Sequence, residues 1–302
     1  MPRRQYRKLE DHIVDVFKND GRFIFQQEQY EVVLVDKPRP QYYGGECKTD
    51  VFVRGKENNS GKLIDLKISV KNENKEFLGN KLKSEDLDSY LGPGWEKVVI
   101  AASQSLRDAF ENAILLYSTR KYPTCENSIT VGWKLEITDK IRKLSVPIPL
   151  SDREIRDFVY KGTNQTPEKK NSSVDGTVIA NSGVADYIII TAESAITCAN
   201  DVIEQMELID DADIGETFFV FTANNYRTDV DRADGPRSLA VRIEWGCENN
   251  KLVPKFCYDN PLHFTGERDM VPFVKEALRK LGKHNINELK EKIDTDLTIW
   301  NS

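Results

Sequence analysis

An alternation of apolar and polar residues over positions 47–71 constrains the fold of this chain more than any other feature. Residues 47–54 and 63–71 each alternate, and the segment 55–61 between them has the composition of a turn, with glycine at both ends. Two alternating runs joined by a turn predict a β-hairpin.

Side chains alternate across a strand, so one face of this hairpin is apolar and carries Val51, Val53, Ile64, Leu66, Ile68 and Val70. The opposite face carries Asp50, Asp65, Lys67, Ser69 and Lys71. The start of one antiparallel strand lies beside the end of the next, so Asp50, Ser69 and Lys71 are expected to cluster at the open end. A shifted register would instead bring Lys67 opposite Asp50. The same polar face is also typical of the solvated side of a sheet.

A carboxylate beside an ammonium group on a rigid sheet suits hydrolysis of a phosphodiester. Asp50 is the candidate ligand for Mg²⁺, which prefers oxygen and polarises a phosphoryl group. Lys71 is the candidate to orient or deprotonate the attacking water, and its charge opposes the charge that builds on phosphorus.

The Thr49-Asp50 pair, the hairpin and Ile68-Ser69-Val70-Lys71 together resemble the core of the PD-(D/E)xK nucleases, and more narrowly that of type II restriction endonucleases. The resemblance covers residues 10 to about 102. It implies that Asp50 binds the metal and that Lys71 is catalytic. It also implies that Glu10, on the first predicted helix, supports the metal.

This chain departs from the family pattern at two positions. Thr49 stands where the family has proline, and Ser69 occupies the position of the second acid. A neutral ligand, a backbone carbonyl or another acid would then complete the metal site, with Glu46, Asp65, Glu73 and Glu76 as candidates. The string Asp65-Leu66-Lys67 matches D-x-K literally and gives an alternative register with Asp65 as the metal ligand.

The expected fold class is α/β (α+β), with a mixed central sheet flanked by helices and a C-terminal α+β subdomain. We expect a nuclease core over residues 1–160. The polar segment 160–176 is the best linker candidate, and residues 161–302 would serve DNA recognition, dimerisation or both. Helices are expected at 3–19, 84–91, 106–117, 193–208, 271–281 and 286–293. Besides the hairpin, strands are expected at 23–25, 30–35, 98–102, 129–137, 177–180, 187–191, 218–222, 239–245 and 252–258.

The composition excludes several classes of site. The histidines at 12, 263 and 284 are too far apart for a paired-histidine metal motif. Five widely spaced cysteines without a Cys-x-x-Cys pair argue against a disulfide framework and a thiolate zinc site. No apolar stretch approaches the roughly 18 residues of a membrane helix, and the charged start lacks a signal-peptide core. We therefore expect a cytoplasmic protein with no membrane partner.

Two basic regions are candidates for reading DNA. The first contains Asn224, Asn225, Arg227, Arg232 and Arg237, because arginine pairs with guanine and asparagine with adenine. The second comprises Lys169 and Lys170 in the polar linker. Aspartates at 229, 231 and 234 offer the alternative that these arginines simply form ion pairs.

The net charge of −6 is unevenly distributed along the chain. Residues 171–226 contain ten acids and no lysine or arginine, whereas the rest of the chain has a positive balance. The expected helix at 193–208 should therefore face away from DNA, or toward another protein surface.

We therefore predict an Mg²⁺-dependent endonuclease of double-stranded DNA, with Asp50, Ser69 and Lys71 as its catalytic residues. It would be a type II site-specific deoxyribonuclease of a restriction-modification system, acting as a homodimer on a palindrome. The alternatives are a non-catalytic DNA- or protein-binding module on the same fold, and a repair nuclease that recognises DNA structure.

Overall fold

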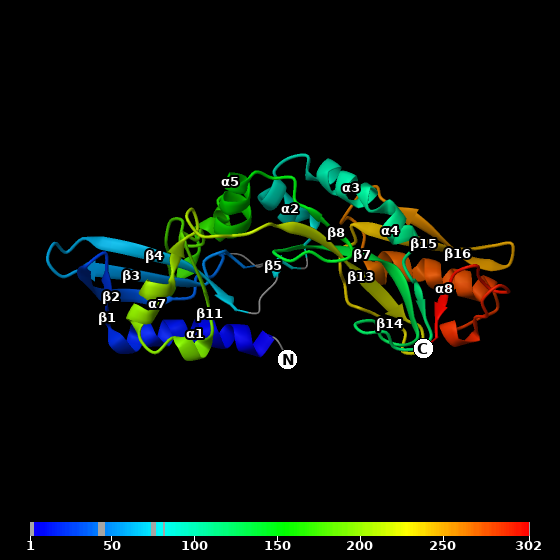
Figure 1. Cartoon of the computed structure of the whole chain (residues 1–302), viewed down its shortest axis with the longest axis horizontal. Coiled ribbons are helices and arrows are strands. Elements are labelled where there is room, and N and C mark those ends of the chain that lie inside the picture. The colour runs from blue at the N-terminus through cyan, green and yellow to red at the C-terminus, as the bar shows by residue number, and fades with distance from the viewer. Residues whose placement is uncertain (1–2, 42–45, 74–76, 81, 302) are drawn as a thin grey trace. The chain divides into compact units, whose positions relative to one another are not determined.

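The computed structural model describes residues 3–41, 46–73, 77–80 and 82–301. It is a mixed α+β protein (Figure 1) that divides into two compact units. Unit 1 consists of residues 1–76, 89–91 and 150–215, and unit 2 of residues 77–88, 92–149 and 216–302. The units interleave along the sequence, so the expected boundary at residue 160 coincides with no edge of either unit. No helix in the described part of the chain is long and apolar enough to cross a membrane.

Unit 1 is built on a six-stranded mixed sheet in the order β1-β2-β3-β4-β11-β12. The first four strands are antiparallel neighbours, whereas β11 runs parallel to β4. The bounds are β1 Arg22–Phe25, β2 Glu28–Asp36, β3 Val51–Glu57, β4 Leu63–Asn72, β11 Tyr187–Thr191 and β12 Glu207–Leu208.

Helices α1 (Arg3–Asp20) and α7 (Ala199–Gln205) cover the apolar face of this sheet. Ile13 and Phe17 of α1 are fully buried against Val53 and Ile68 of the hairpin. The opposite face is covered around Phe52 by Val174 and Ile179. The predicted helix 3–19 and the predicted hairpin are therefore confirmed, and the apolar face predicted for the hairpin is the core face.

The segment expected to be a linker is folded into unit 1. It contains the end of a π-helix (Ile155–Lys161), α6 (Pro167–Lys170) and the strand β9 (Ser173–Val174), which pairs with β10 (Thr177–Val178). The α5 turn (Asp152–Glu154) precedes the π-helix and has Ser151 as its N-cap. Backbone bonds between Arg39 and Ser173 attach β9 to the end of the first sheet.

Unit 2 has a nine-stranded sheet whose main path is β14-β13-β7-β15-β16, with α8 (Val271–Lys280) packed against β15. Its strands are β5 Phe77–Gly79, β6 Leu116–Tyr117, β7 Ser128–Thr138, β8 Ser145–Pro147, β13 Phe218–Arg227, β14 Arg232–Ala233, β15 Val241–Glu248, β16 Lys251–Cys257 and β17 Ile299–Trp300. The helical segments are α3 Trp95–Ser105, α4 Arg107–Glu111, a π-helix Gly266–Met270 and a 3₁₀ turn Ile286–Glu288. Helix α2 (Ser84–Leu91) is divided between the two units.

Four expected elements differ from the structure. Residues 98–102, predicted as a strand, lie inside α3, because Trp95, Val99 and Ser103 bury one helical face. The helix expected at 106–117 ends at Glu111, since Leu116 and Tyr117 pair with β7 as a strand. The helix expected at 193–208 is interrupted before Ala199, where Asp201 accepts hydrogen bonds from Thr197 and Cys198. Only a 3₁₀ turn forms within 286–293.

Candidate functional site

The open end of the β3–β4 hairpin brings together the three predicted catalytic residues. Asp50 immediately precedes β3, and its backbone amide donates to the carbonyl of Ile68 at 2.9 Å. Its Oδ2 accepts a hydrogen bond from the hydroxyl of Ser69 at 3.3 Å and lies 3.4 Å from Nζ of Lys71. The backbone amide of Val70 donates to the same oxygen at 2.7 Å. The carboxylate is therefore fixed by strand β4 itself.

Glu10 adds a second carboxylate beside Asp50, from the first half of α1. Burial, and next the charge of Asp50, raise the pKa of Glu10 above its ordinary value, although Lys37 and Lys71 oppose the rise. The influence of Asp50 and Lys71 on Glu10 places the three side chains in one electrostatic cluster. We refer to Glu10, Lys37, Asp50, Ser69 and Lys71 as the acid–lysine cluster.

Lys37 is a further member of this cluster, which the sequence alone did not indicate. It directly follows β2, and its Nζ lies 2.7 Å from Oε2 of Glu10 and 3.0 Å from Oδ1 of Asp11. Burial lowers the pKa of Lys37, but the bonds to Glu10 and Asp11 outweigh it and the net pKa is raised. The available signal in the sequence was a polar residue after a predicted strand. The sequence did not reveal that the partners of Lys37, Glu10 and Asp11, lie on a helix from an earlier part of the chain.

A loop from later in the chain holds the two residues that precede Asp50. The carbonyl of Gly183 accepts the backbone amides of Lys48 and Thr49 at 3.0 and 3.3 Å. A Cβ at Gly183 would meet the carbonyl of Lys169 at 1.9 Å, so this close approach requires glycine. The segment 169–183 thus holds the residues that precede β3, a role that the sequence did not reveal.

The alternative register does not occur. Val51 pairs with Ile68 and Phe52 with Lys67, so the position opposite Asp50 is that of Ser69, two residues from Lys67. Asp65 instead lies opposite Arg54 and accepts two bonds from its guanidinium, at 2.7 and 2.8 Å. Lys67 forms an ion pair with Asp186 at 2.9 Å. Of the other candidate acids, Glu46 and Glu73 are exposed, and Glu76 lies outside the described residues.

The residues predicted to read DNA bases have different environments. Asn224 is fully buried, and Asn225 is buried with hydrogen bonds to Thr130 and Asp234. Neither amide can reach a base edge in this conformation, because both lie inside unit 2. Arg232 is exposed, whereas Arg227, Arg237, Lys169 and Lys170 are half-buried. The Nε of Arg227 is buried without a hydrogen-bond partner among the described residues.

No group of three or more His, Cys, Asp and Glu side chains with suitable placement occurs among the described residues. The acid–lysine cluster contributes two carboxylates and the Ser69 hydroxyl, all oxygen donors. Mg²⁺ is commonly bound through one or two carboxylates together with water and substrate phosphate, so this set is compatible with it.

Comparison with known proteins gives no relative from which a role could be transferred: no protein family, no curated protein and no solved structure matches this chain.

Proposed function

We propose that this protein is an Mg²⁺-dependent endonuclease that hydrolyses phosphodiester bonds of double-stranded DNA, in the manner of type II restriction enzymes. The observation that carries the proposal is the contact of Lys71 with Oδ2 of Asp50, at 3.4 Å, with Glu10 in the same electrostatic cluster. Both side chains of the contact are largely buried, with 17 % and 22 % exposed. A fixed carboxylate and ammonium next to a second acid are the groups that this hydrolysis needs.

The strand arrangement of unit 1 gives additional support. A helix, an antiparallel run of strands and a further strand parallel to the last of them follow one another in α1, β2, β3, β4 and β11. This arrangement is similar to the core expected from the family resemblance. The strand that pairs with β4 here is β11, from residues 187–191, whereas residues 98–102, predicted as a strand within the resemblance, are part of α3.

Each group in the cluster has a defined part in the proposed reaction. When bound, Mg²⁺ would polarise the scissile phosphate, and Asp50 and Glu10 are the residues that would hold it. The pKa of Glu10 is raised by burial first and next by the charge of Asp50, and a dication would relieve the repulsion between the two carboxylates. Lys71 would orient the attacking water and stabilise the charge that develops on phosphorus. Ser69 donates to Asp50 and keeps its carboxylate in place.

Cleavage of DNA tests the proposal directly. Purified protein with Mg²⁺ is expected to cut supercoiled plasmid, and Asp50→Asn and Lys71→Met should each abolish cutting while duplex binding in EDTA is retained. Lys67→Met is the matched control, since Lys67 lies on the same face of the same strand but pairs with Asp186. Loss of cutting in Lys67→Met with retention in Lys71→Met would overturn the assignment of Lys71.

The digestion pattern also separates the kinds of nuclease. Discrete bands from a long DNA support a sequence-specific enzyme, and for a palindromic site a homodimer would place one cluster on each strand. Cutting confined to branched or flapped DNA supports the structure-specific repair nuclease.

A non-catalytic binding module is the second candidate. It is favoured by Ser69 at the position where the family has its second acid, because this leaves one carboxylate fewer for a metal. Duplex binding by the wild-type protein without cutting of any DNA in Mg²⁺ or Mn²⁺ would support this alternative.

A further inference from the structure

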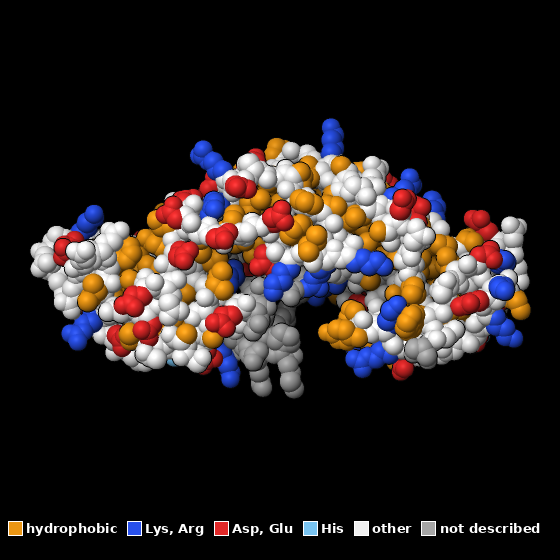
Figure 2. All heavy atoms as spheres, viewed as in Figure 1, with side chains coloured by type: hydrophobic (Ala, Val, Ile, Leu, Met, Phe, Trp, Pro, Cys, Tyr) orange, Lys and Arg blue, Asp and Glu red, His pale blue; other side chains and the backbone are white. Residues whose placement is uncertain are grey.

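Lys37 is a half-buried cation of the acid–lysine cluster that two carboxylates share. Its Nζ lies 2.7 Å from Oε2 of Glu10 and 3.0 Å from Oδ1 of Asp11. Positive and negative side chains are intermixed over the face that Figure 2 shows, and an ion pair between exposed groups contributes little. The contact of Lys37 with Glu10 differs, because only 27 % and 21 % of the two side chains are exposed.

The two carboxylates that share Lys37 differ in their surroundings. The side chain of Asp11 is 60 % exposed, whereas that of Glu10 is largely buried. The charges of Asp50 and Lys71 both act on Glu10. Successive residues of a helix point in directions about 100° apart, so an ammonium group that contacts both lies between them. Glu10 is therefore the inner partner of the ammonium group, and Asp11 is its outer partner, in contact with solvent.

The backbone that carries Lys37 is fixed on both sides, so its ammonium group moves through the side chain. Lys37 follows the last residue of β2 and precedes the buried Pro38, and a residue before proline is restricted to extended conformations. Backbone bonds in both directions between Arg39 and Ser173, at 2.8 and 2.7 Å, attach the segment that follows to β9. A rotation about the torsions of the lysine stem can therefore leave Nζ on Asp11 alone without a change in the fold.

A divalent ion held by Glu10 and Asp50 would change the balance of charge around Glu10. In the metal-free protein the ammonium group at 2.7 Å is the counter-charge of this carboxylate. An ammonium group and a dication that share one partly buried carboxylate repel each other, because the protein screens their charges less than water does. Asp11 offers the ammonium group a second carboxylate, which it already contacts at 3.0 Å.

We propose that Lys37 is an exchangeable counter-ion, which neutralises Glu10 while no divalent ion is bound and is held by Asp11 alone when one is bound. This role of Lys37 rests on the proposed function, in which Asp50 and Glu10 hold the divalent ion. Asp11 is then a positioning residue, which acts through Lys37 and not as a ligand. Lys37 opposes binding of the ion, and Asp11 favours binding because it accepts the released ammonium group.

Binding of Mn²⁺ by the full-length protein without DNA tests this role apart from cleavage. Mn²⁺ takes the same kinds of oxygen ligand as Mg²⁺, and the EPR signal of the free ion measures how much is bound. Asp50→Asn gives the background of ions bound elsewhere. Lys37→Met should bind Mn²⁺ about tenfold more tightly than the wild-type protein, because the competing charge is removed. Lys37→Arg keeps that charge and should bind Mn²⁺ as the wild-type protein does. Asp11→Asn should bind Mn²⁺ about three- to fivefold more weakly, since the ammonium group has no second carboxylate.

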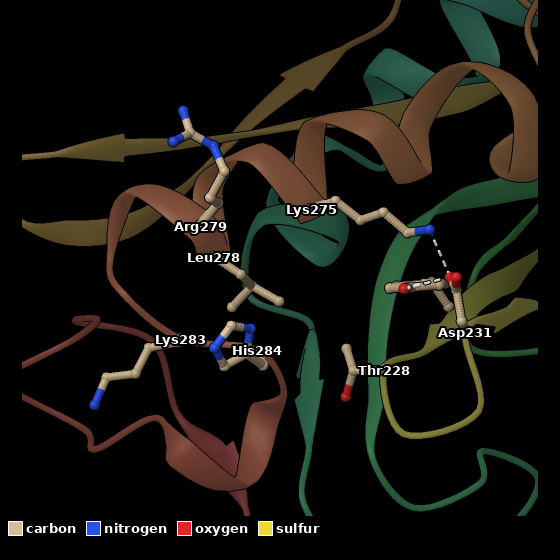
Figure 3. A pocket seen from close by; sticks show the side chains of 8 residues that line it. Thr228, Asp231, Lys275, Leu278, Arg279, Lys283 and His284 are labelled. Carbon is tan, nitrogen blue, oxygen red and sulfur yellow. Dashed lines mark hydrogen bonds and ion pairs between the residues drawn. The ribbon is translucent and has the colours of Figure 1, made fainter.

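A double-mutant cycle separates this exchange from a general effect of charge. Without Lys37 there is no ammonium group for Asp11 to hold, so Asp11→Asn/Lys37→Met should bind Mn²⁺ as tightly as Lys37→Met. Asp15→Asn removes an exposed acid one turn further along α1 and should have little effect. Lys275→Met is the control for loss of an ammonium group, since Lys275 of unit 2 is paired with Asp231 at 2.6 Å (Figure 3).

Equal weakening by Asp11→Asn with and without Lys37 would overturn the proposal, since Asp11 would then act by its charge alone. Unchanged or weaker binding by a folded Lys37→Met would also overturn it and make the contact a fixed link between α1 and β2. If Lys37→Met does not fold, equal affinities of Asp11→Asn and Asp15→Asn would refute the exchange. Each of these results leaves Mn²⁺ binding dependent on Asp50 and the proposed function intact. Absence of Asp50-dependent binding in every variant would instead refute the proposed ion site, and this exchange with it.

Discussion

Nζ of Lys37 lies between two successive carboxylates of α1, 2.7 Å from Glu10 and 3.0 Å from Asp11. This contact joins the helix to the end of β2 next to Asp50, and it balances the charge of Glu10 while no metal ion is bound. Glu10 is therefore both a structural contact of α1 and the second acid of the proposed site. The two roles lead to opposite expectations for a replacement of Glu10. Without a divalent ion the replacement should stabilise the protein, whereas with one it should remove a ligand of the ion.

Without divalent ions, Glu10→Gln should stabilise the protein more at pH 8 than at pH 4. The pKa of Glu10 is raised, by burial above all and next by Asp50, so the folded protein binds this proton more tightly than the unfolded chain does. Between the ordinary and the raised pKa, the wild-type protein loses stability as pH rises, and the glutamine variant does not. The melting temperature of each protein from pH 4 to 8 measures this difference.

The control for that experiment is Asp11→Asn, which alters the same ammonium contact from a side chain that is 60 % exposed. A difference between Glu10→Gln and wild type that stays constant across this pH range would refute the burial argument.

Mg²⁺ or Ca²⁺ should raise the melting temperature of the wild-type protein and have no effect on Asp50→Asn. An ion at 100 times its dissociation constant stabilises the folded state by about 2.7 kcal/mol. Lys71→Met should retain or increase this response, because it removes an ammonium group that lies 3.4 Å from the same carboxylate. An equal response of Asp50→Asn and wild type in a thermal melt would place the ion elsewhere.

Asp65→Asn should reduce stability but leave DNA cleavage intact. Its carboxylate makes two bonds to the Arg54 guanidinium, and both side chains are about 30 % exposed. Loss of such a partly exposed bidentate pair should lower the free energy of unfolding by about 1 kcal/mol. Urea unfolding measures the stability and plasmid cleavage the activity of the same preparation. Loss of cleavage would instead support Asp65 as the metal ligand.

Asn224→Leu should increase the stability of unit 2 and leave DNA binding unchanged. The Asn224 side chain is fully buried, and neither its oxygen nor its nitrogen has a hydrogen-bond partner among the described residues. An unsatisfied buried polar group costs about 1–3 kcal/mol, so an apolar side chain of similar shape should raise the free energy of unfolding by at least about 1 kcal/mol.

The neighbouring Asn225→Leu is the matched control for that substitution. It removes bonds to Thr130 and Asp234 and should destabilise the protein by about 1–3 kcal/mol. Chemical denaturation of both variants separates the two sites, and weaker duplex binding by Asn224→Leu would restore this residue to the DNA contact.

The hairpin and the clustering of Asp50 with Ser69 and Lys71 could be predicted from sequence. The alternation of residues fixes the sheet face of each side chain, and the short turn fixes which residues lie beside one another on the two strands. The bracing of Asp50 by Gly183 could not, since it depends on a contact between segments more than one hundred residues apart. The same limit applies to Lys37, whose partners are on α1.

Short apolar runs were the main source of error in the predicted elements. Val98 to Ala102 reads equally well as a buried strand or as part of a helix, and only packing of Trp95 and Val99 decides between them. Polar composition was similarly ambiguous. The segment 160–176 reads as a linker, but its Val174 is fully buried beside Phe52.

The parallel pairing of β4 with β11 has a consequence for synthesis on the ribosome. Strand β4 ends at Asn72 and β11 begins at Tyr187, so much of unit 2 is translated between them. At about 5–20 residues per second, this delay is on the order of ten seconds. During that time the nascent hairpin has an unpaired edge, which is a template for misassembly. The Gly183 carbonyl that holds Thr49 arrives in the same late segment. The nascent chain therefore assembles the complete support of Asp50 only after residues 77–88 and 92–149 of unit 2 have been made.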